Sequence, residues 1–130
     1  LYVGRGEGRR LSPDVSAVSD PSTGVKFVFR QAIFSGGGTS MAAPLWAGMA
    51  AVLNQYLVAN GGRPLGDINP LLYEVAQGAK LPGFRYVARG ANAVDRSIAG
   101  YDLVTGLGTP RLSNLAQNLL AIQRSWIGVG

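Results

Sequence analysis

The sequence of 130 residues contains no cysteine and no histidine. Without cysteine it can form neither a disulfide framework nor a thiolate nucleophile. Without histidine it cannot by itself hold a complete serine–histidine catalytic pair or a histidine-ligated zinc site. Any metal site in this chain must therefore be built from oxygen ligands.

Charged residues are also scarce, at 15% of the chain, whereas hydrophobic residues make up 47%. That balance is typical of a packed domain or part of one. The 12 Lys and Arg residues exceed the 7 Asp and Glu residues, giving a net charge of +5. These basic residues are scattered and no aromatic residues interleave with them, so we expect no nucleic-acid partner.

No membrane segment is expected either. The uncharged run at residues 41–53 is shorter than the roughly 20 residues that span a bilayer. The first residues show neither an initiator methionine nor the layout of a signal peptide. We therefore expect the chain to begin within a longer protein.

The first half of the chain predicts two strands and a helix. Residues 1–24 are rich in Gly, Ser, Pro and Asp and predict irregular connections. Alternating β-formers predict strands at 25–30 and 32–34. The apolar run that follows predicts a helix over 41–57, buried on all sides, with Pro44 in its first turn.

The second half predicts two further helices. Asn69 and Pro70 are suited to the N-cap and first helical positions of one helix. Residues 80–110 are punctuated by glycine and predict loops and short strands. Ser113 is expected to cap a last, amphipathic helix that continues through Ile122.

The segment Gly-Gly-Gly-Thr-Ser at residues 36–40 precedes the predicted apolar helix. The glycines allow a sharp turn and close approach of another backbone. Ser40 would lie at a helix N-terminus, where free N–H groups and the helix dipole stabilise negative charge, as a nucleophilic serine requires. Locally the alternative stays open that Thr39 or Ser40 only caps the helix. A phosphate-binding loop is less well supported, because no lysine follows the glycines.

The segment Gly-Thr-Ser-Met-Ala-Ala-Pro at residues 38–44 resembles the serine motif of the subtilisin superfamily. Where subtilases typically continue with His-Val-Ala-Gly, this chain has Leu-Trp-Ala-Gly and then Asn-Gln. This continuation is similar to sedolisins, the serine-carboxyl peptidases. Further segments match that family in order, namely residues 13–17 with 20–24, 69–73 and 101–110.

The resemblance implies an α/β, subtilisin-like catalytic domain, of which residues 1–130 form the carboxy-terminal portion. Sedolisins are secreted endopeptidases that act at acid pH with a Ser-Glu-Asp triad. Ser40 matches the nucleophile, and Gly37, Gly38 and Thr39 match the edge that binds the peptide or protein substrate. A carboxylate base suits acid pH, where an imidazole would be protonated.

The family's Glu and Asp partners lie upstream of the serine, and no segment of this chain resembles those upstream motifs. Asp14 matches a structural position in the family. We therefore expect this chain to need an upstream portion of the same catalytic domain, and to be inactive or nearly so alone.

Sedolisins also bind one calcium ion through two Asp side chains and several backbone carbonyls. Asp102 matches the second of these carboxylates, and Gly100 and Ile98 match carbonyl ligands. The first carboxylate falls at Tyr86, which cannot replace it, although Asp95 in the intervening loop is a candidate substitute. Calcium binding and a capped turn at Asp102 both stay open.

Two other functions remain as alternatives. The chain could be part of a subtilase whose His and Asp lie on another segment, although the residues after Pro44 argue against this. It could also belong to a non-catalytic sedolisin homologue that acts as a binding module.

Overall fold

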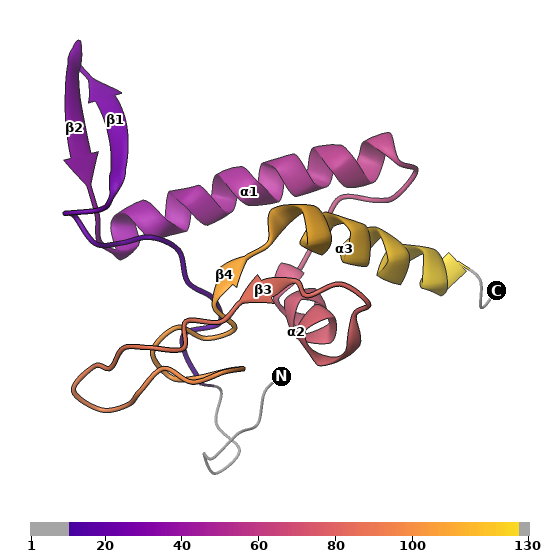
Figure 1. Ribbon diagram of the computed structural model, residues 1–130. Coiled ribbons are helices and arrows are strands. Elements are labelled where there is room, and N and C mark those ends of the chain that lie inside the picture. Colours follow the sequence, from indigo (N-terminus) through magenta and orange to yellow (C-terminus); the bar gives the residue numbers. More distant parts are fainter. Residues whose placement is uncertain (1–10, 128–130) are drawn as a thin grey trace.

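Residues 11–127 of the chain are described by a computed structural model, and they contain both helices and strands, compatible with the predicted α/β class. The elements are β1 (Val25–Phe29), β2 (Ala32–Gly36), α1 (Thr39–Ala59), α2 (Ile68–Gly78), β3 (Phe84–Arg85), β4 (Thr109–Pro110) and α3 (Leu112–Ile127). The β1–β2 hairpin projects beside the first turn of α1, away from the other helices (Figure 1). None of the helices in the described residues has the length and apolarity needed to cross a membrane.

β1 and β2 form an antiparallel hairpin in which Phe27 pairs with Phe34 and Val28 with Ile33. Strands were predicted in both places, but β1 ends at Phe29 and the turn begins one residue earlier than expected. Arg30 and Gln31 both have positive φ, 47° and 65°. Turns with this geometry match the natural twist of paired strands, so the turn and not the strand takes Arg30.

α1 is longer than the helix predicted over 41–57. It begins at Thr39, so Thr39 and Ser40 are already helical. Gly38 lies just before it and has a positive φ (φ 81°, ψ 169°). Pro44 consequently lies in the second turn of the helix and not in the first. The prediction that this helix is buried on all sides is wrong for the described residues, because α3 packs along α1 and leaves much of its surface uncovered; only Leu53 and Leu57 are buried.

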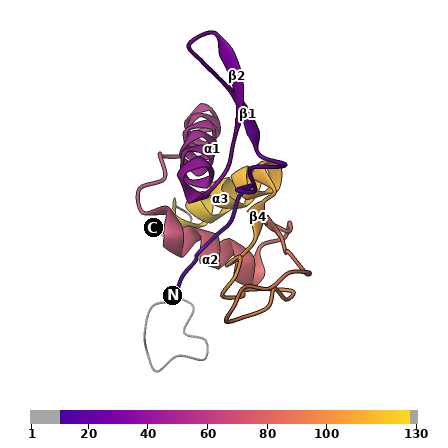
Figure 2. The same ribbon diagram turned by 90° about the vertical axis from the view of Figure 1, so that its left-hand side faces the viewer.

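The hydrophobic core lies where the second half of α1, α2 and α3 meet. Figure 2 looks along the molecule from the hairpin side and shows α1, α3 and α2 stacked in that order. α2 and α3 are amphipathic, as their apolar spacing requires, and they contact each other. The buried apolar residues are Leu53, Leu57, Leu65, Leu71, Leu72, Tyr73, Val75, Phe84, Leu107, Leu115, Ala116, Leu119 and Leu120.

Two helix starts differ from the predictions. α2 begins at Ile68, and its N-cap is Asp67, whose carboxylate accepts a hydrogen bond from the Asn69 backbone N–H at 3.3 Å. Asn69 is therefore not the N-cap, and Pro70 is not the first helical residue. α3 begins at Leu112, so Ser113 is already helical and does not cap it.

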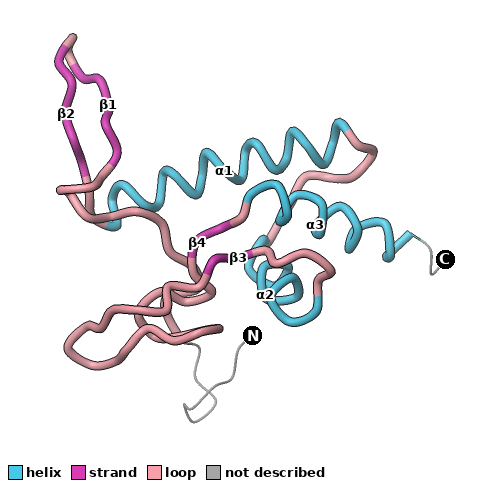
Figure 3. The backbone as a smooth tube through the Cα atoms, viewed as in Figure 1, coloured by secondary structure: helices cyan, strands magenta, loops and turns pink. Residues whose placement is uncertain are grey.

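Most of the segment between β3 and β4 is loop (Figure 3). Only isolated bridges, from Ala91 to Arg96 and from Asp102 to Gly106, interrupt it. This agrees with the prediction of loops and short strands over 80–110.

Candidate active site

Ser40 is the second residue of α1 and is exposed to solvent. The carbonyl of Gly38 accepts the first helical hydrogen bonds, from the backbone N–H groups of Met41 at 3.0 Å and Ala42 at 3.2 Å. Gly38 is therefore the N-cap residue. Thr39 and Ser40 are already helical, so neither performs the capping role considered as the alternative, and no side chain caps this helix.

The surroundings of Ser40 favour negative charge. Its hydroxyl makes no hydrogen bond to another described residue, and the first turn of α1 carries no acidic side chain. The backbone N–H groups of Thr39 and Ser40 precede the first helical bonds, at the positive end of the helix dipole. An oxyanion that forms beside Ser40 Oγ would therefore be stabilised by this helix end.

The glycine loop at 36–38 is positioned by the turn at residues 19–24. The Gly38 backbone N–H donates a hydrogen bond to the carbonyl of Ser19. A Cβ atom on Gly37 would lie 2.5 Å from both Ser19 O and Pro21 N. Only glycine permits this approach of two backbones, so the turn at 19–24 fixes the path that the chain takes into Ser40.

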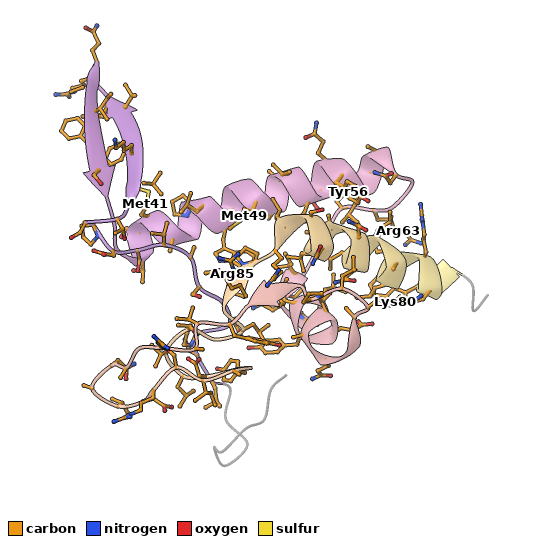
Figure 4. The ribbon with its side chains drawn as sticks, in the orientation of Figure 1. Met41, Met49, Tyr56, Arg63, Lys80 and Arg85 are labelled. Atoms are coloured by element: carbon orange, nitrogen blue, oxygen red, sulfur yellow. The ribbon has the colours of Figure 1, made fainter. Side chains whose placement is uncertain are left out.

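Two further contacts strengthen this support. The Ser35 hydroxyl donates a hydrogen bond to the Pro21 carbonyl at 3.2 Å. A Cβ atom on Gly36 would lie 2.7 Å from Met41 Cε and 2.9 Å from Phe27 Cε1, so this glycine is enclosed by side chains of the helix and the hairpin. Figure 4 shows Met41 on the turn of α1 next to the hairpin.

The turn at 19–24 is held by Asp20. Its carboxylate accepts hydrogen bonds from the Ser22 backbone N–H at 2.9 Å and from the Thr23 hydroxyl at 3.1 Å. The Ser22 N–H, followed by the Thr23 hydroxyl, lowers the pKa of Asp20 below its usual 3.8. The Asp-Pro-Ser-Thr-Gly string was recognised as a family motif, but its support of the serine loop was not predicted.

No carboxylate in residues 11–127 forms a hydrogen bond with Ser40. Asp14, expected to be structural, accepts hydrogen bonds from the Tyr73 hydroxyl at 2.7 Å and the Asn69 amide at 3.3 Å. Its carbonyl also accepts from the Leu107 backbone N–H at 2.8 Å. Asp14 thus links its own segment to α2 and to the loop before β4, in agreement with a structural role.

Asp102 is also held within a turn, and its side chain is only 5% exposed. Oδ1 accepts hydrogen bonds from the backbone N–H groups of Val104 at 2.8 Å and Thr105 at 2.7 Å. Oδ2 accepts from the Ile98 N–H at 3.1 Å, and the Thr105 hydroxyl lies within hydrogen-bond distance of both oxygens. Burial is the largest single effect on the pKa of Asp102, and it raises this pKa. The hydrogen bonds from Thr105, Ile98 and Val104 together outweigh burial, so the pKa lies below its usual 3.8.

These contacts test whether the residues present fit the family's calcium ion. An ionised carboxylate has about four lone-pair sites, and the donors around Asp102 already occupy both of its oxygens. Tyr86, which matches the other carboxylate position in the family, has no carboxylate to offer. Asp95, the candidate substitute, accepts a hydrogen bond from the Arg96 N–H at 2.8 Å within its own turn. One of the two carboxylates is thus replaced, and the other is engaged by N–H donors on both oxygens, so this donor set does not fit calcium.

A cavity of about 420 Å³ lies away from Ser40 and is lined by the loop after α1, the start of α2 and the end of α3, including Arg63, Asp67 and Trp126. The helix α1 separates Arg63 from Met41 in Figure 4. The lining of this cavity includes no residue of the serine loop at 36–40.

No family model matches the chain. Kumamolisin of Bacillus sp. (strain MN-32) is 37% identical over 123 residues, which cover 90% of this chain and 21% of kumamolisin. Tripeptidyl-peptidase 1 of Homo sapiens is 35% identical over 121 residues, covering 85% of this chain and 20% of the relative. Tripeptidyl-peptidase 1 of Dictyostelium discoideum is 32% identical over 114 residues, covering 83% and 18% respectively.

These relatives are peptidases. An exposed serine in the first turn of a helix, directly after a glycine loop, is an arrangement that suits this class of protein. The chain belongs to the sedolisin family, as its ordered motifs indicated. It spans about a fifth of the length of the curated relatives that it matches.

Several motif residues have structural roles that the sequence did not reveal. The Trp46 indole N–H donates a hydrogen bond to the Ser16 carbonyl at 3.1 Å and so ties α1 to the segment that ends at Asp20. The side-chain carbonyl of Asn54 accepts from the Leu65 backbone N–H at 2.7 Å. The motif strings marked these residues, but their partners lie 11 or more positions away along the chain.

Proposed function

We propose that this chain supplies the nucleophile Ser40 of an acid-acting serine-carboxyl endopeptidase that hydrolyses peptide bonds. The observation that carries the proposal is the placement of Ser40. It is an exposed serine that does not cap its helix, at the positive end of a 21-residue helix. Membership of the sedolisin family supports the same role.

In this mechanism Ser40 Oγ attacks the carbonyl carbon of the scissile peptide, and an upstream carboxylate accepts its proton. The Ser40 backbone N–H contributes one donor to the oxyanion that forms. Gly37, Gly38 and Thr39 line the edge where the substrate backbone lies, and glycine allows the close approach. The protonated carboxylate returns its proton to the leaving amine as the C–N bond breaks, and water then hydrolyses the ester on Ser40 and restores its hydroxyl.

The triad is completed by an upstream portion of the same catalytic domain. No described carboxylate bonds to Ser40, and this sequence contains no histidine that could act as the base instead. The hairpin supports the same conclusion. Phe27, Phe29 and Phe34 lie on one face, and Val28 and Ile33 on the other, all of them exposed. A hairpin that is apolar on both faces is typical of one that is covered in a larger fold.

The complete domain is proposed to have the subtilisin-like α/β fold, with residues 1–130 as its carboxy-terminal part, and to be secreted. Its substrates are peptides or proteins. Neither nucleic acid nor a membrane is proposed as a partner, since basic residues are scattered and the described helices do not span a bilayer.

The test uses the complete protein that contains this chain, assayed for peptide cleavage from acid to neutral pH. Ser40→Ala should lower kcat by about 10³-fold or more, because no other group can replace the nucleophile. Ser113→Ala is the matched control, because Ser113 is likewise the exposed second residue of a helix. It should leave activity unchanged. Equal activity of wild type and Ser40→Ala would overturn the assignment.

The two alternatives give different results in the same assay. A subtilase would use an imidazole base, lose activity as pH falls through about 6.5, and react readily with organophosphates. A binding module would cleave nothing at any pH while still folding.

A further inference from the structure

We infer that hydrogen bonds to Asp102 hold the loop at residues 98–106 closed in this chain, in the place where its relatives' motif provides for calcium. The inference concerns stability and does not depend on Ser40 being a nucleophile. Three observations support it: the hydrogen bonds to the Asp102 carboxylate, the similar turn at Asp20, and the connection of the loop to Leu107 in the core.

The Asp102 carboxylate is fully engaged by its own loop. Backbone N–H groups reach it from both sides, from Ile98 before it and from Val104 and Thr105 after it. The Thr105 hydroxyl adds contacts of 3.2 Å and 3.0 Å to the two oxygens. A carboxylate that accepts several N–H bonds is stabilised in its charged form without a cation.

The same turn occurs a second time in the chain, outside the segment that matches the family's calcium site. Asp20-Pro21-Ser22-Thr23-Gly24 and Asp102-Leu103-Val104-Thr105-Gly106 share the pattern Asp-x-x-Thr-Gly. In both, the carboxylate accepts from the backbone N–H two residues later and from the Thr hydroxyl three residues later. The two turns differ in burial, since Asp20 is exposed and Asp102 is buried. Asp102 also accepts from the backbone N–H groups of Ile98 and Thr105.

Burial matters because the Asp102 turn supports the core. The carbonyl of Asp102 accepts a hydrogen bond from the Gly106 N–H at 3.0 Å, and the Gly106 carbonyl accepts one from the Asp102 N–H at 3.2 Å. The next residue, Leu107, is buried in the core and donates its N–H to the Asp14 carbonyl at 2.8 Å. Opening the turn would therefore displace a core residue as well as a surface loop.

Calcium dependence is measured by thermal unfolding of the complete protein that contains this chain, in excess EDTA and in millimolar calcium. The expected result is the same Tm in both. A site that calcium filled to a hundred times its Kd would stabilise the folded protein by about 2.7 kcal/mol and raise the Tm. Such a rise, or saturable terbium luminescence that calcium displaces, would overturn the inference.

The role of the hydrogen bonds is measured with Thr105→Val, which removes the hydroxyl and keeps the shape. We expect a Tm several degrees lower, by the same amount with EDTA and with calcium. Thr23→Val makes the identical change in the exposed Asp20 turn and should shift the Tm by much less. If both variants unfold at the same temperature as wild type, the hydrogen bonds do not hold the loop.

Thr105→Ser keeps the hydroxyl and covers the case in which Thr105→Val does not fold. A folded Thr105→Ser with a Tm near that of wild type, beside an unfolded Thr105→Val, supports the inference. Loss of folding in both variants would contradict it, because the hydroxyl would then be present without effect.

Discussion

Gly38 determines where α1 begins, since its backbone conformation (φ 81°, ψ 169°) is one that only glycine adopts at low cost. Thr39 and Ser40 are helical because the chain turns at this residue. Threonine or serine at position 38 would favour an ordinary capped start and a different direction of entry. The exposure of Ser40 thus depends on a residue that has no side chain.

Gly38→Ala should therefore destabilise the chain, by about 1–3 kcal/mol. The matched control is Gly48→Ala in the middle of α1, where an added Cβ meets nothing within 4 Å. Alanine is the better helix former by about 1 kcal/mol, so the control should be stabilised. Urea unfolding of both variants gives the free energies, and a neutral Gly38→Ala would show that the backbone at this position is not constrained.

Protonation of Asp20 at low pH would weaken the turn at residues 19–24, which supports the serine loop. Its pKa is below 3.8 in the folded chain because the Ser22 N–H and then the Thr23 hydroxyl bond to the carboxylate. A lowered pKa contributes stability that is fully present above the unfolded value and is lost as the pH falls through the folded one. The turn should therefore remain intact at mildly acid pH and weaken only below about 3.8.

Thr23→Val tests this directly, since it removes one of the two main hydrogen bonds and should raise the pKa of Asp20 part of the way to its usual value. The measurement is an NMR titration of the Asp20 carboxyl carbon. Thr39→Val, which changes a threonine outside the turn, is expected to leave this pKa unaltered. An unchanged pKa in Thr23→Val would mean that the hydroxyl does not bond to Asp20 in solution.

At the scale of elements, α1 is attached to the core by its second half. Leu57 is fully buried with Leu115 and Leu119 of α3, whereas the neighbouring Val58 is 54% exposed. Leu57→Ala should lower the free energy of unfolding by about 2–5 kcal/mol, because it leaves a cavity in the core. Val58→Ala removes apolar side-chain volume from the same turn but on the exposed side, and should cost less than about 1 kcal/mol. Similar losses in urea unfolding for the two variants would contradict the packing of α1 on α3.

The sequence predicted the elements better than their ends or their contacts. Alternation of β-formers and the apolar run located the hairpin and α1, because these patterns are local. Asn69 and Ser113 were wrongly predicted as caps, because a cap depends on the backbone angles at a single residue, which the residue type alone does not determine. The bond from Tyr73 to Asp14 spans 59 positions, and no local pattern encodes such a partner.

The candidate site was predictable to a similar degree. The motif at 36–40 located the serine, and the structure adds that Gly38, not Thr39 or Ser40, caps the helix. The support from Ser19 and Pro21 could not be predicted, because it consists of backbone atoms brought together by the fold. The capped turn at Asp102 was foreseen as one of two outcomes, and the donors around its oxygens, together with Tyr86 at the other carboxylate position, favour it over calcium.

On the scale of the whole molecule, the chain exposes apolar surface that a larger fold would cover. Val28 and Ile33 form a cross-strand pair that is 73% and 74% exposed. Three phenylalanine side chains lie on the opposite face of the same hairpin. A two-stranded hairpin with exposed apolar faces and unpaired edges favours association with other chains.

We therefore expect the isolated chain to self-associate as its concentration rises, and the double variant Val28→Lys/Ile33→Lys to remain monomeric. The substitutions place two like charges on one face of the hairpin and remove its most exposed apolar pair. Because neither side chain belongs to the core, the Tm of the helical part should change little.

Light scattering across a concentration series measures the mass of the associated species. Lys26→Gln, on the same face, serves as the control and should associate as wild type does. Association that persists in the double variant would place the contact elsewhere, with the uncovered side of α1 as the next surface to substitute.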